Sequence, residues 1–234
     1  MSAFIKFGCI SIREMFLGVQ SSKIISSESK LALLSQLLWR EFYLYITYYF
    51  PRVLHGEYYN PKYNKLKTRW IKGKKGRDYL ERWKNGQTGY PVVDAGMIQL
   101  NKTGYMHNRA RLITANFMNR MLGLDWRWGE QYYATKLVDY DPSVNNGNWQ
   151  WIASTGVDPK PYFQRLFNPK LQSAKFDPDA EYIKTWIPQL KDIPANELHN
   201  WDENFTKYDL KKLNYHEPVV NYKNARELSR TQYK

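Results

Sequence analysis

The apolar residues of this chain recur at three- and four-residue steps, and no run of five or more residues alternates cleanly between apolar and polar. The first spacing places side chains on one face of a helix, whereas a half-buried strand needs alternation. The clearest example predicts a helix whose buried stripe consists of Leu31, Leu34, Leu38, Phe42 and Tyr45. A second stripe on the same helix consists of Gln36, Trp39, Arg40 and Tyr43. The pattern predicts an all-α fold in one domain with loop-rich connections.

Three further helices are expected from their boundary residues. Residues 91–100 begin with a proline, which is favoured in the first turn. Residues 106–122 form a longer apolar segment, and Gly123 is placed to cap it. A third helix is predicted to begin at Asp177-Pro178, with the aspartate as cap, and to stop at Pro188.

Composition excludes several classes of protein. The 234 residues include 9 Trp, 19 Tyr and 10 Phe, too many aromatic residues for a disordered chain. One cysteine excludes a disulfide framework and a cysteine-rich zinc site. The four histidines have no metal-ligand spacing, so no metal site is expected. There is also no Gly-rich phosphate fingerprint, because Gly73-Lys-Lys-Gly76 lacks the Lys-Ser/Thr that should follow.

The chain carries no apparent membrane or secretion signal. Its most apolar stretch, residues 31–50, is interrupted by Arg40 and Glu41, whereas a membrane span needs ~18 apolar residues. The N-terminal segment is broken by Lys6 and Arg13 and lacks the apolar centre of a secretion signal. We therefore expect a cytoplasmic or nuclear protein.

The net charge of +13 is concentrated in residues 1–170, and its densest part is the stretch Lys62–Arg77, which contains no acidic residue. Such a stretch is either a solvated loop or a surface that contacts phosphates, and charge alone does not separate the two. The remaining polar candidates lie among aromatic residues in segments 35–43, 104–112 and 137–152. Asn108, Arg111 and Leu112 would share one helix face. Arg111 could pair with Asp139 or Asp141, and a purely structural ion pair across an aromatic core fits the same residues.

These segments resemble the C-terminal, FAD-binding half of the cryptochrome/photolyase family. The resemblance runs through the whole chain in the family's order, in the segments SAFIKFGCISIRE, LLWREFY, TGYPVVDAGMIQL, GYMHNRAR, LGLDW, DYDPSVNNGNWQW, YFQRLFNP and FDPDAEYIKTWIPQL. It implies a helical domain, residues 1–234, that holds FAD beside a pocket for a flipped-out DNA lesion. It also implies that the last ~30 residues form a peripheral tail.

The resemblance assigns cofactor roles to five residues. Asn145 matches the residue that faces flavin N5. Arg111 and Asp139 match an ion pair beside the flavin ring, Asp141 matches a contact at the flavin edge, and Ser2 matches the last serine of the phosphate-binding segment.

Electron transfer is assigned to tryptophans. Trp149 and Trp126 match the first two members of an electron relay, and either Trp70 or Trp83 would be the third.

Substrate binding is assigned to a further group. Trp39 and Trp151 match aromatic residues that stack on the flipped bases, and Asn108, Arg109 and Arg40 match polar contacts to the dinucleotide.

Within the family, the chain is most similar to the class I cyclobutane pyrimidine dimer photolyases. Gln36 stands where that class has Glu, and resembles the (6-4) photolyases and animal cryptochromes. That branch needs a histidine pair where this chain has Asn108 and Leu112, which disfavours (6-4) chemistry. The segments LGLDWRWGE and DYDP also resemble DASH cryptochromes, from which Trp151 departs.

Relative to this family the chain is expected to be N-terminally truncated, without the α/β antenna domain and most of the phosphate-binding segment. Three interpretations remain open. The chain is a light-driven DNA repair enzyme, a carbon–carbon lyase, that works with a second polypeptide carrying the α/β domain. Alternatively, it is a cryptochrome-like flavin- or DNA-binding module, or a decayed fragment without repair activity.

Overall fold

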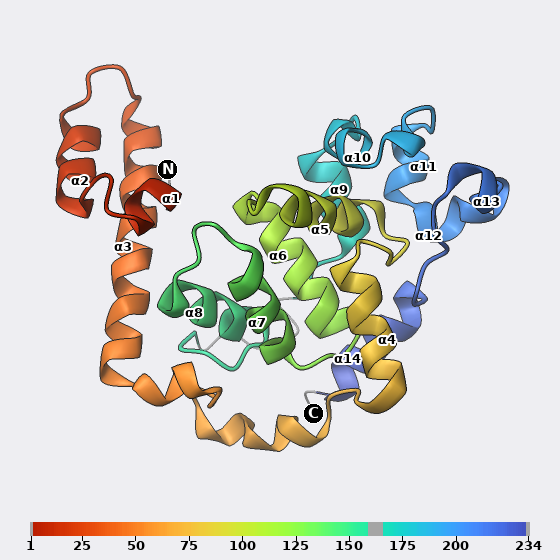
Figure 1. Cartoon of the computed structure of the whole chain (residues 1–234), viewed down its shortest axis with the longest axis horizontal. Helices are drawn as coiled ribbons and strands as arrows, with labels where there is room; N and C mark the ends of the chain where they lie inside the picture. The colour runs from red at the N-terminus through yellow and green to blue at the C-terminus, as the bar shows by residue number, and fades with distance from the viewer. Residues whose placement is uncertain (1, 159–165, 233–234) are drawn as a thin grey trace.

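The computed structural model describes residues 2–158 and 166–232, and in this part of the chain every regular element is a helix or a helical turn (Figure 1). The all-α class predicted from the sequence is confirmed. No helix among the described residues is long and apolar enough to cross a membrane. The helices are α1 (Ser2–Lys6), α2 (Ile12–Ser21), α3 (Ser27–Tyr49), α4 (Gly73–Lys84), α5 (Pro91–Thr103), α6 (Asn108–Asn116), α7 (Trp126–Lys136), α8 (Pro142–Ile152), α9 (Pro169–Phe176), α10 (Glu181–Trp186), α11 (Ala195–His199), α12 (Trp201–Asn204), α13 (Leu210–Leu213) and α14 (Tyr222–Gln232). The short turns are η1 (Pro51–His55), η2 (Pro61–Thr68), η3 (Phe117–Met121, a π-helix), η5 (Pro188–Leu190) and η6 (Phe205–Lys207).

The first three helices form an arm at the edge of the molecule (Figure 1). Helix α2 begins with a capping box, in which Ser11 and Glu14 satisfy each other's backbone N–H groups. It packs on α3 through a small core of Met15, Val19 and Leu37. Helix α3 reaches the rest of the chain through α8 and η1.

The apolar stripe of α3 faces solvent, which corrects the expectation that it is buried. Leu31 is 72% exposed, Leu38 62% and Tyr45 61%, whereas Tyr43 from the second stripe is buried. The helix was predicted correctly because both stripes have helical spacing. Which stripe faces inward depends on where α8 lies, and local spacing carries no information about that.

The main core is built around α5, α6, α7 and α8. Helix α5 has Pro91 in its first turn and ends at Gly104, whose φ of +68° closes the C-terminus. Most of this helix is buried, and it runs three residues beyond the predicted 91–100. The aromatic residues Trp83, Trp126 and Phe117 are almost completely enclosed in the same core.

The segment expected as one helix over 106–122 begins at Asn108 and changes to a π-helix at Phe117. Gly123, with a φ of +63°, follows it as predicted. The wider turn contains Arg120, which is fully buried and donates to the carbonyl of Ile152 and the hydroxyl of Ser154. Arg120 thereby ties the end of α8 to the core.

The predicted helix start at Asp177-Pro178 is wrong by several residues. Asp177 ends α9, and α10 begins at Glu181, after Ala180 has adopted a left-handed φ of +56°. The Asp177 carboxylate nevertheless caps α10, because it accepts the backbone N–H groups of Tyr182 and Ile183. The residue type was correct for a cap, but the extra turn displaced the helix it serves. At the far end, Pro188 opens the turn η5 as α10 stops.

The C-terminal region packs against the core, so its description as a peripheral tail is corrected. Helix α14 lies against η3 and buries Ala225 and Ser229. Before it, the Tyr215 hydroxyl donates to the buried Asp94 carboxylate at 2.6 Å. Asp94 also accepts the Thr88 hydroxyl and the backbone N–H groups of Thr88 and Gly89. One carboxylate therefore joins the C-terminal region to the start of α5.

We predict that Tyr215→Phe lowers the free energy of unfolding by about 1–3 kcal/mol, because it removes a charge-assisted hydrogen bond inside the core. Urea denaturation followed by circular dichroism measures this. Tyr48→Phe is the control, since Tyr48 is 78% exposed. Equal effects of the two substitutions would contradict the role given to the Asp94 cluster.

Candidate functional site

Three adjoining cavities lie where α3, α6, α8 and the loop 137–141 meet. We name them the inner cavity, of about 110 Å³, the N-terminal cavity, of about 300 Å³, and the outer cavity, of about 310 Å³. Asn108 and Val144 line all three cavities. Among the described residues, no group of three or more His, Cys, Asp or Glu could hold a metal ion.

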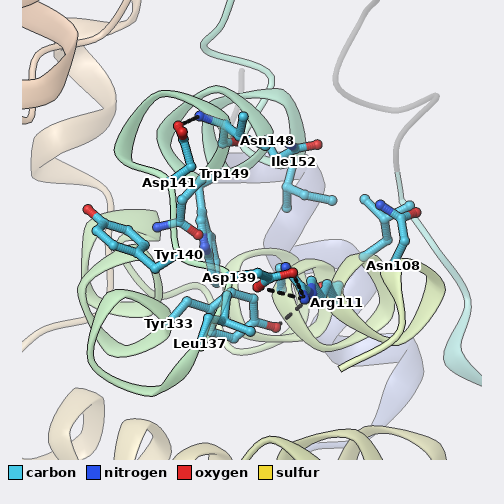
Figure 2. A pocket seen from close by; sticks show the side chains of 14 residues that line it. Asn108, Arg111, Tyr133, Leu137, Asp139, Tyr140, Asp141, Asn148, Trp149 and Ile152 are labelled. Atoms are coloured by element: carbon cyan, nitrogen blue, oxygen red, sulfur yellow. Dashed lines mark hydrogen bonds and ion pairs between the residues drawn. The ribbon is translucent and has the colours of Figure 1, made fainter. Parts of the chain in front are cut away.

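The ion-paired residues Arg111 and Asp139 line both the inner and the N-terminal cavity, and Figure 2 shows the pair at the inner one. Arg111, on α6, donates through Nη2 to both carboxylate oxygens of Asp139 at 2.9 and 3.0 Å, and through Nε to the Met106 carbonyl at 2.7 Å. The Asp139 carboxylate is only 4% exposed. The expected pairing of Arg111 is therefore with Asp139. Asp141 instead caps α8 by accepting the N–H groups of Ser143 and Val144.

Asn145 is held in the inner cavity by α7. Its Nδ2 donates to the backbone carbonyl and to Oε1 of Glu130, both at 3.1 Å, which leaves the amide oxygen for the cavity. Burial raises the pKa of the Glu130 carboxyl above its ordinary value, and the hydrogen bond from Asn145 offsets part of that rise. The sequence did not indicate Glu130, because its partner lies fifteen residues away on another helix.

Two glycines let α8 approach its neighbours closely. A Cβ on Gly147 would overlap the ring of Tyr43 on α3, and a Cβ on Gly129 of α7 would overlap the ring of Trp149. The first contact sets the distance between α3 and α8, which form two walls of the outer cavity, and the second sets the distance between α7 and α8.

The tryptophans assigned to a relay are buried in two groups. Trp149 packs against Trp83 and Tyr133, with ring centroids 6.3 and 5.0 Å apart. Trp126 lies 6.3 Å from Tyr58, whose hydroxyl accepts the indole N–H of Trp70 at 3.2 Å. Of the two candidates for the third position, Trp83 therefore contacts Trp149, and Trp70 is joined through Tyr58 to Trp126.

The outer cavity brings together most of the residues predicted to bind substrate. Its lining includes Gln36, Trp39, Arg40, Asn108 and Trp151. Trp39 is 52% exposed at the rim.

Arg109 lines none of the three cavities, because its guanidinium lies over the ring of Phe176 at 4.3 Å. Ser2 lines the N-terminal cavity together with Lys6. The outer cavity also includes Tyr43 and Asn148, to which the sequence analysis gave no role there. The Asn-Asn-Gly-Asn run was the only available signal for Asn148.

The basic stretch Lys62–Arg77 lies mainly on η2 and the start of α4. Lys72, Lys74 and Lys75 are exposed, while the side chains of residues 65–68 lie outside the described part. Helix α4 packs on α5, and through Trp83 near its C-terminal end it also contacts Trp149 of α8.

The side chains that line the inner and N-terminal cavities suit a flat heteroaromatic group joined to an anion. The inner cavity has apolar walls, including Leu112, Ala115 and Ile152, and a polar edge formed by Asn145 and the Arg111–Asp139 pair. The N-terminal cavity offers the hydroxyl of Ser2 and the cation of Lys6. Apolar faces with a few convergent polar groups are typical of cofactor sites.

Comparison with known proteins identifies similar chains. The family model described as the FAD binding domain of DNA photolyase matches residues 33–234. A deoxyribodipyrimidine photo-lyase of Halobacterium salinarum is 39% identical over 233 residues, which cover 97% of this chain and 47% of that protein. This chain spans about half the length of the curated relatives it matches.

Solved structures agree with the sequence comparison. The crystal structure of an archaeal photolyase from Sulfolobus tokodaii with two FAD molecules has a TM-score of 0.84 and 43% identity, covering 99% of this chain and 49% of that one. A bacterial class III photolyase from Agrobacterium tumefaciens has a TM-score of 0.88 and 34% identity, covering 99% and 48%.

We predict that Glu130→Gln changes how stability depends on pH. A raised carboxyl pKa means that the contribution of Glu130 is fully present below its unfolded-state pKa and is lost as pH rises through the folded value. Glutamine keeps the acceptor for Asn145 without the charge, so the variant should be more stable than the unsubstituted chain at pH 7 and similar at pH 4. Urea denaturation at both pH values, with the exposed Glu227→Gln as control, tests this. Parallel pH profiles would contradict it.

Proposed function

The chain belongs to the FAD-binding domain family of DNA photolyase, and from this premise we propose that it binds FAD and takes part in light-driven repair of cyclobutane pyrimidine dimers in DNA. FAD would occupy the inner and N-terminal cavities, and the flipped dimer the outer cavity. The proposal rests on the observation that the inner and outer cavities share a wall. It is formed by side chains that line both, namely Asn108, Leu112, Val144 and Asn148.

The residues around the two cofactor cavities fit FAD. A flavin ring would find apolar walls in the inner cavity, with Asn145 and the Arg111–Asp139 pair at its polar edge. Asp141 lines both cavities, and Ser2 and Lys6 would face the phosphates. FAD, when bound in reduced form, supplies an electron under light and takes it back after the two cyclobutane carbon–carbon bonds have opened.

The protein's own residues would position the partners and exclude water. Glu130 fixes the amide of Asn145, so this polar group need not reorganise when the cofactor binds. The apolar Leu112 and Val144 would keep the space between the two cavities dry.

The outer cavity would hold the flipped dinucleotide. Trp39 and Trp151 offer aromatic faces, and Gln36, Arg40 and Asn108 offer polar groups to its edges. Arg109 would reach the DNA only by leaving Phe176. A role in reading DNA implies residence in the cytoplasm or nucleus.

Trp149 and Trp126 are proposed as relay residues that conduct electrons between the inner cavity and the surface. Trp149 lines the inner cavity and is buried, as is Trp126. Trp149 contacts Trp83 and Trp126 contacts Tyr58, so each tryptophan has an aromatic neighbour to which oxidation could pass within its own group.

A second polypeptide is a further part of the proposal. In the apolar stripe of α3, Leu31, Leu38 and Tyr45 are exposed, and Phe4 and Phe7 are exposed on the same arm. Clustered apolar surface of this kind typically marks an interaction site. A polypeptide that supplies the α/β half of a photolyase would cover it.

The proposal predicts that the chain, reconstituted with FAD, retains flavin absorption and splits dimers in an oligonucleotide under blue light but not in the dark. Trp39→Ala should weaken binding to dimer-containing DNA by about 5- to 150-fold, since a stacked base contributes about 1–3 kcal/mol. Absorption spectra, dimer quantification and filter binding measure these outcomes.

Tyr48→Ala is the matched control, because Tyr48 is an exposed aromatic residue elsewhere on the surface of α3. Bound flavin with unchanged dimer content would contradict repair and favour a binding module. A spectrum without flavin bands would contradict cofactor binding by this chain.

Lys72, Lys74 and Lys75 are predicted to contact phosphates. Replacing all three with Gln should reduce the slope of log affinity against log salt by about 1–3, because fewer counterions are released on binding. The matched control replaces Lys191, Lys211 and Lys212, which are exposed and lie outside the basic region of residues 1–170. An unchanged slope would identify the stretch as a solvated loop.

A further inference from the structure

The three asparagines of α8 have separate partners. Asn145 is held by Glu130 of α7, and the buried Asn146 donates to the Val53 carbonyl of η1 at 3.0 Å. Asn148 lines both the inner and the outer cavity. The first two asparagines therefore fix neighbouring elements, whereas the third faces the space between the two proposed ligands.

Asn148 retains hydrogen-bonding capacity. Its Nδ2 donates to the Val144 carbonyl one turn earlier at 2.8 Å, which uses one of its two N–H groups and holds the amide against its own helix. The other N–H and the carbonyl oxygen remain as a donor and an acceptor. In Figure 2, Asn148 on α8 and Asn108 on α6 lie on different sides of the inner cavity.

The polar lining of the outer cavity is dominated by carboxamides. Gln36, Asn108 and Asn148 come from three different helices, and none of the described residues that line this cavity carries a carboxylate. Among the described lining residues the cation is Arg40, which is paired with Glu41 at 2.7 Å. A pyrimidine edge presents neighbouring donor and acceptor groups without a charge, and a carboxamide carries both complementary groups.

We propose that Asn148, which lies in the wall shared with the cofactor cavity, is a specificity-determining residue that hydrogen-bonds the edge of a flipped pyrimidine. The inference rests on the proposed function and extends it. Asn148 completes a set of three neutral amides, so the cavity recognises uncharged pyrimidine edges by hydrogen-bond geometry rather than by charge. Since Asn148 also lines the inner cavity, its contact fixes the base directly against the wall that Leu112 and Val144 keep apolar.

The test measures the affinity of the full chain for two oligonucleotides, one containing a single cyclobutane thymine dimer and the other undamaged. Asn148→Leu preserves size but removes the amide, and should weaken binding to the dimer oligonucleotide about five-fold while leaving affinity for undamaged DNA unchanged. Asn148→Asp preserves shape but replaces both N–H groups, including the one bonded to the Val144 carbonyl, with a negatively charged oxygen, and should weaken dimer binding further. Asn224→Leu, an exposed asparagine on α14, is the matched control.

The possible results distinguish a failure of the role of Asn148 from a failure of the proposed function. If the unsubstituted chain discriminates between the oligonucleotides and both Asn148 variants discriminate equally well, the role of Asn148 is overturned and the proposed function stands. An equal loss of affinity for both oligonucleotides would also overturn it, because the effect would then be general. If the unsubstituted chain does not discriminate at all, the proposed function fails and the inference fails with it.

Discussion

The close packing of α8 against its neighbours is the constraint on which the rest of the site depends. Gly147 brings α8 against Tyr43 of α3, and Gly129 brings α7 against Trp149 of α8. Any side chain at either position would overlap an aromatic ring and separate the helices. Because α8 carries Asn145, Asn148 and Trp149, its position fixes both the inner and the outer cavity.

Buried charges hold the elements around α8 in place. Arg111 joins α6 to the loop before α8 through Asp139, and Arg120 holds the residues at the end of α8. Farther from α8, Asp94 joins the C-terminal region to α5 by accepting the Tyr215 hydroxyl. Removing Arg111 alone would leave the buried Asp139 carboxylate without its charged partner, which costs more than the intact pair gains. These contacts therefore favour one arrangement of the helices strongly over its alternatives.

The arm formed by α1, α2 and α3 has two faces with different consequences. One face of α3 lines the outer cavity through Gln36, Trp39 and Arg40, while the opposite face exposes Leu31 and Leu38. Residues on both faces recur at three- and four-residue steps along the same helix. The helix therefore connects the proposed substrate site to the surface that we propose a second polypeptide covers.

The sequence by itself determined the helical class, the start of α5 and the residue types that the cavities use, because helix periodicity and Pro91 act within a few residues of chain. The resemblance also indicated Arg111, Asp139, Asn145 and the outer-cavity tryptophans, whose roles remain proposals. Only the tertiary structure decided which stripe of α3 is buried, that Asp177 caps a helix starting four residues later, and that Glu130 holds Asn145. It also placed Arg109 on Phe176 and Asn148 at the wall between two cavities. These outcomes depend on contacts between residues on different helices, and the spacing of residues along one helix contains no record of which neighbour will face it.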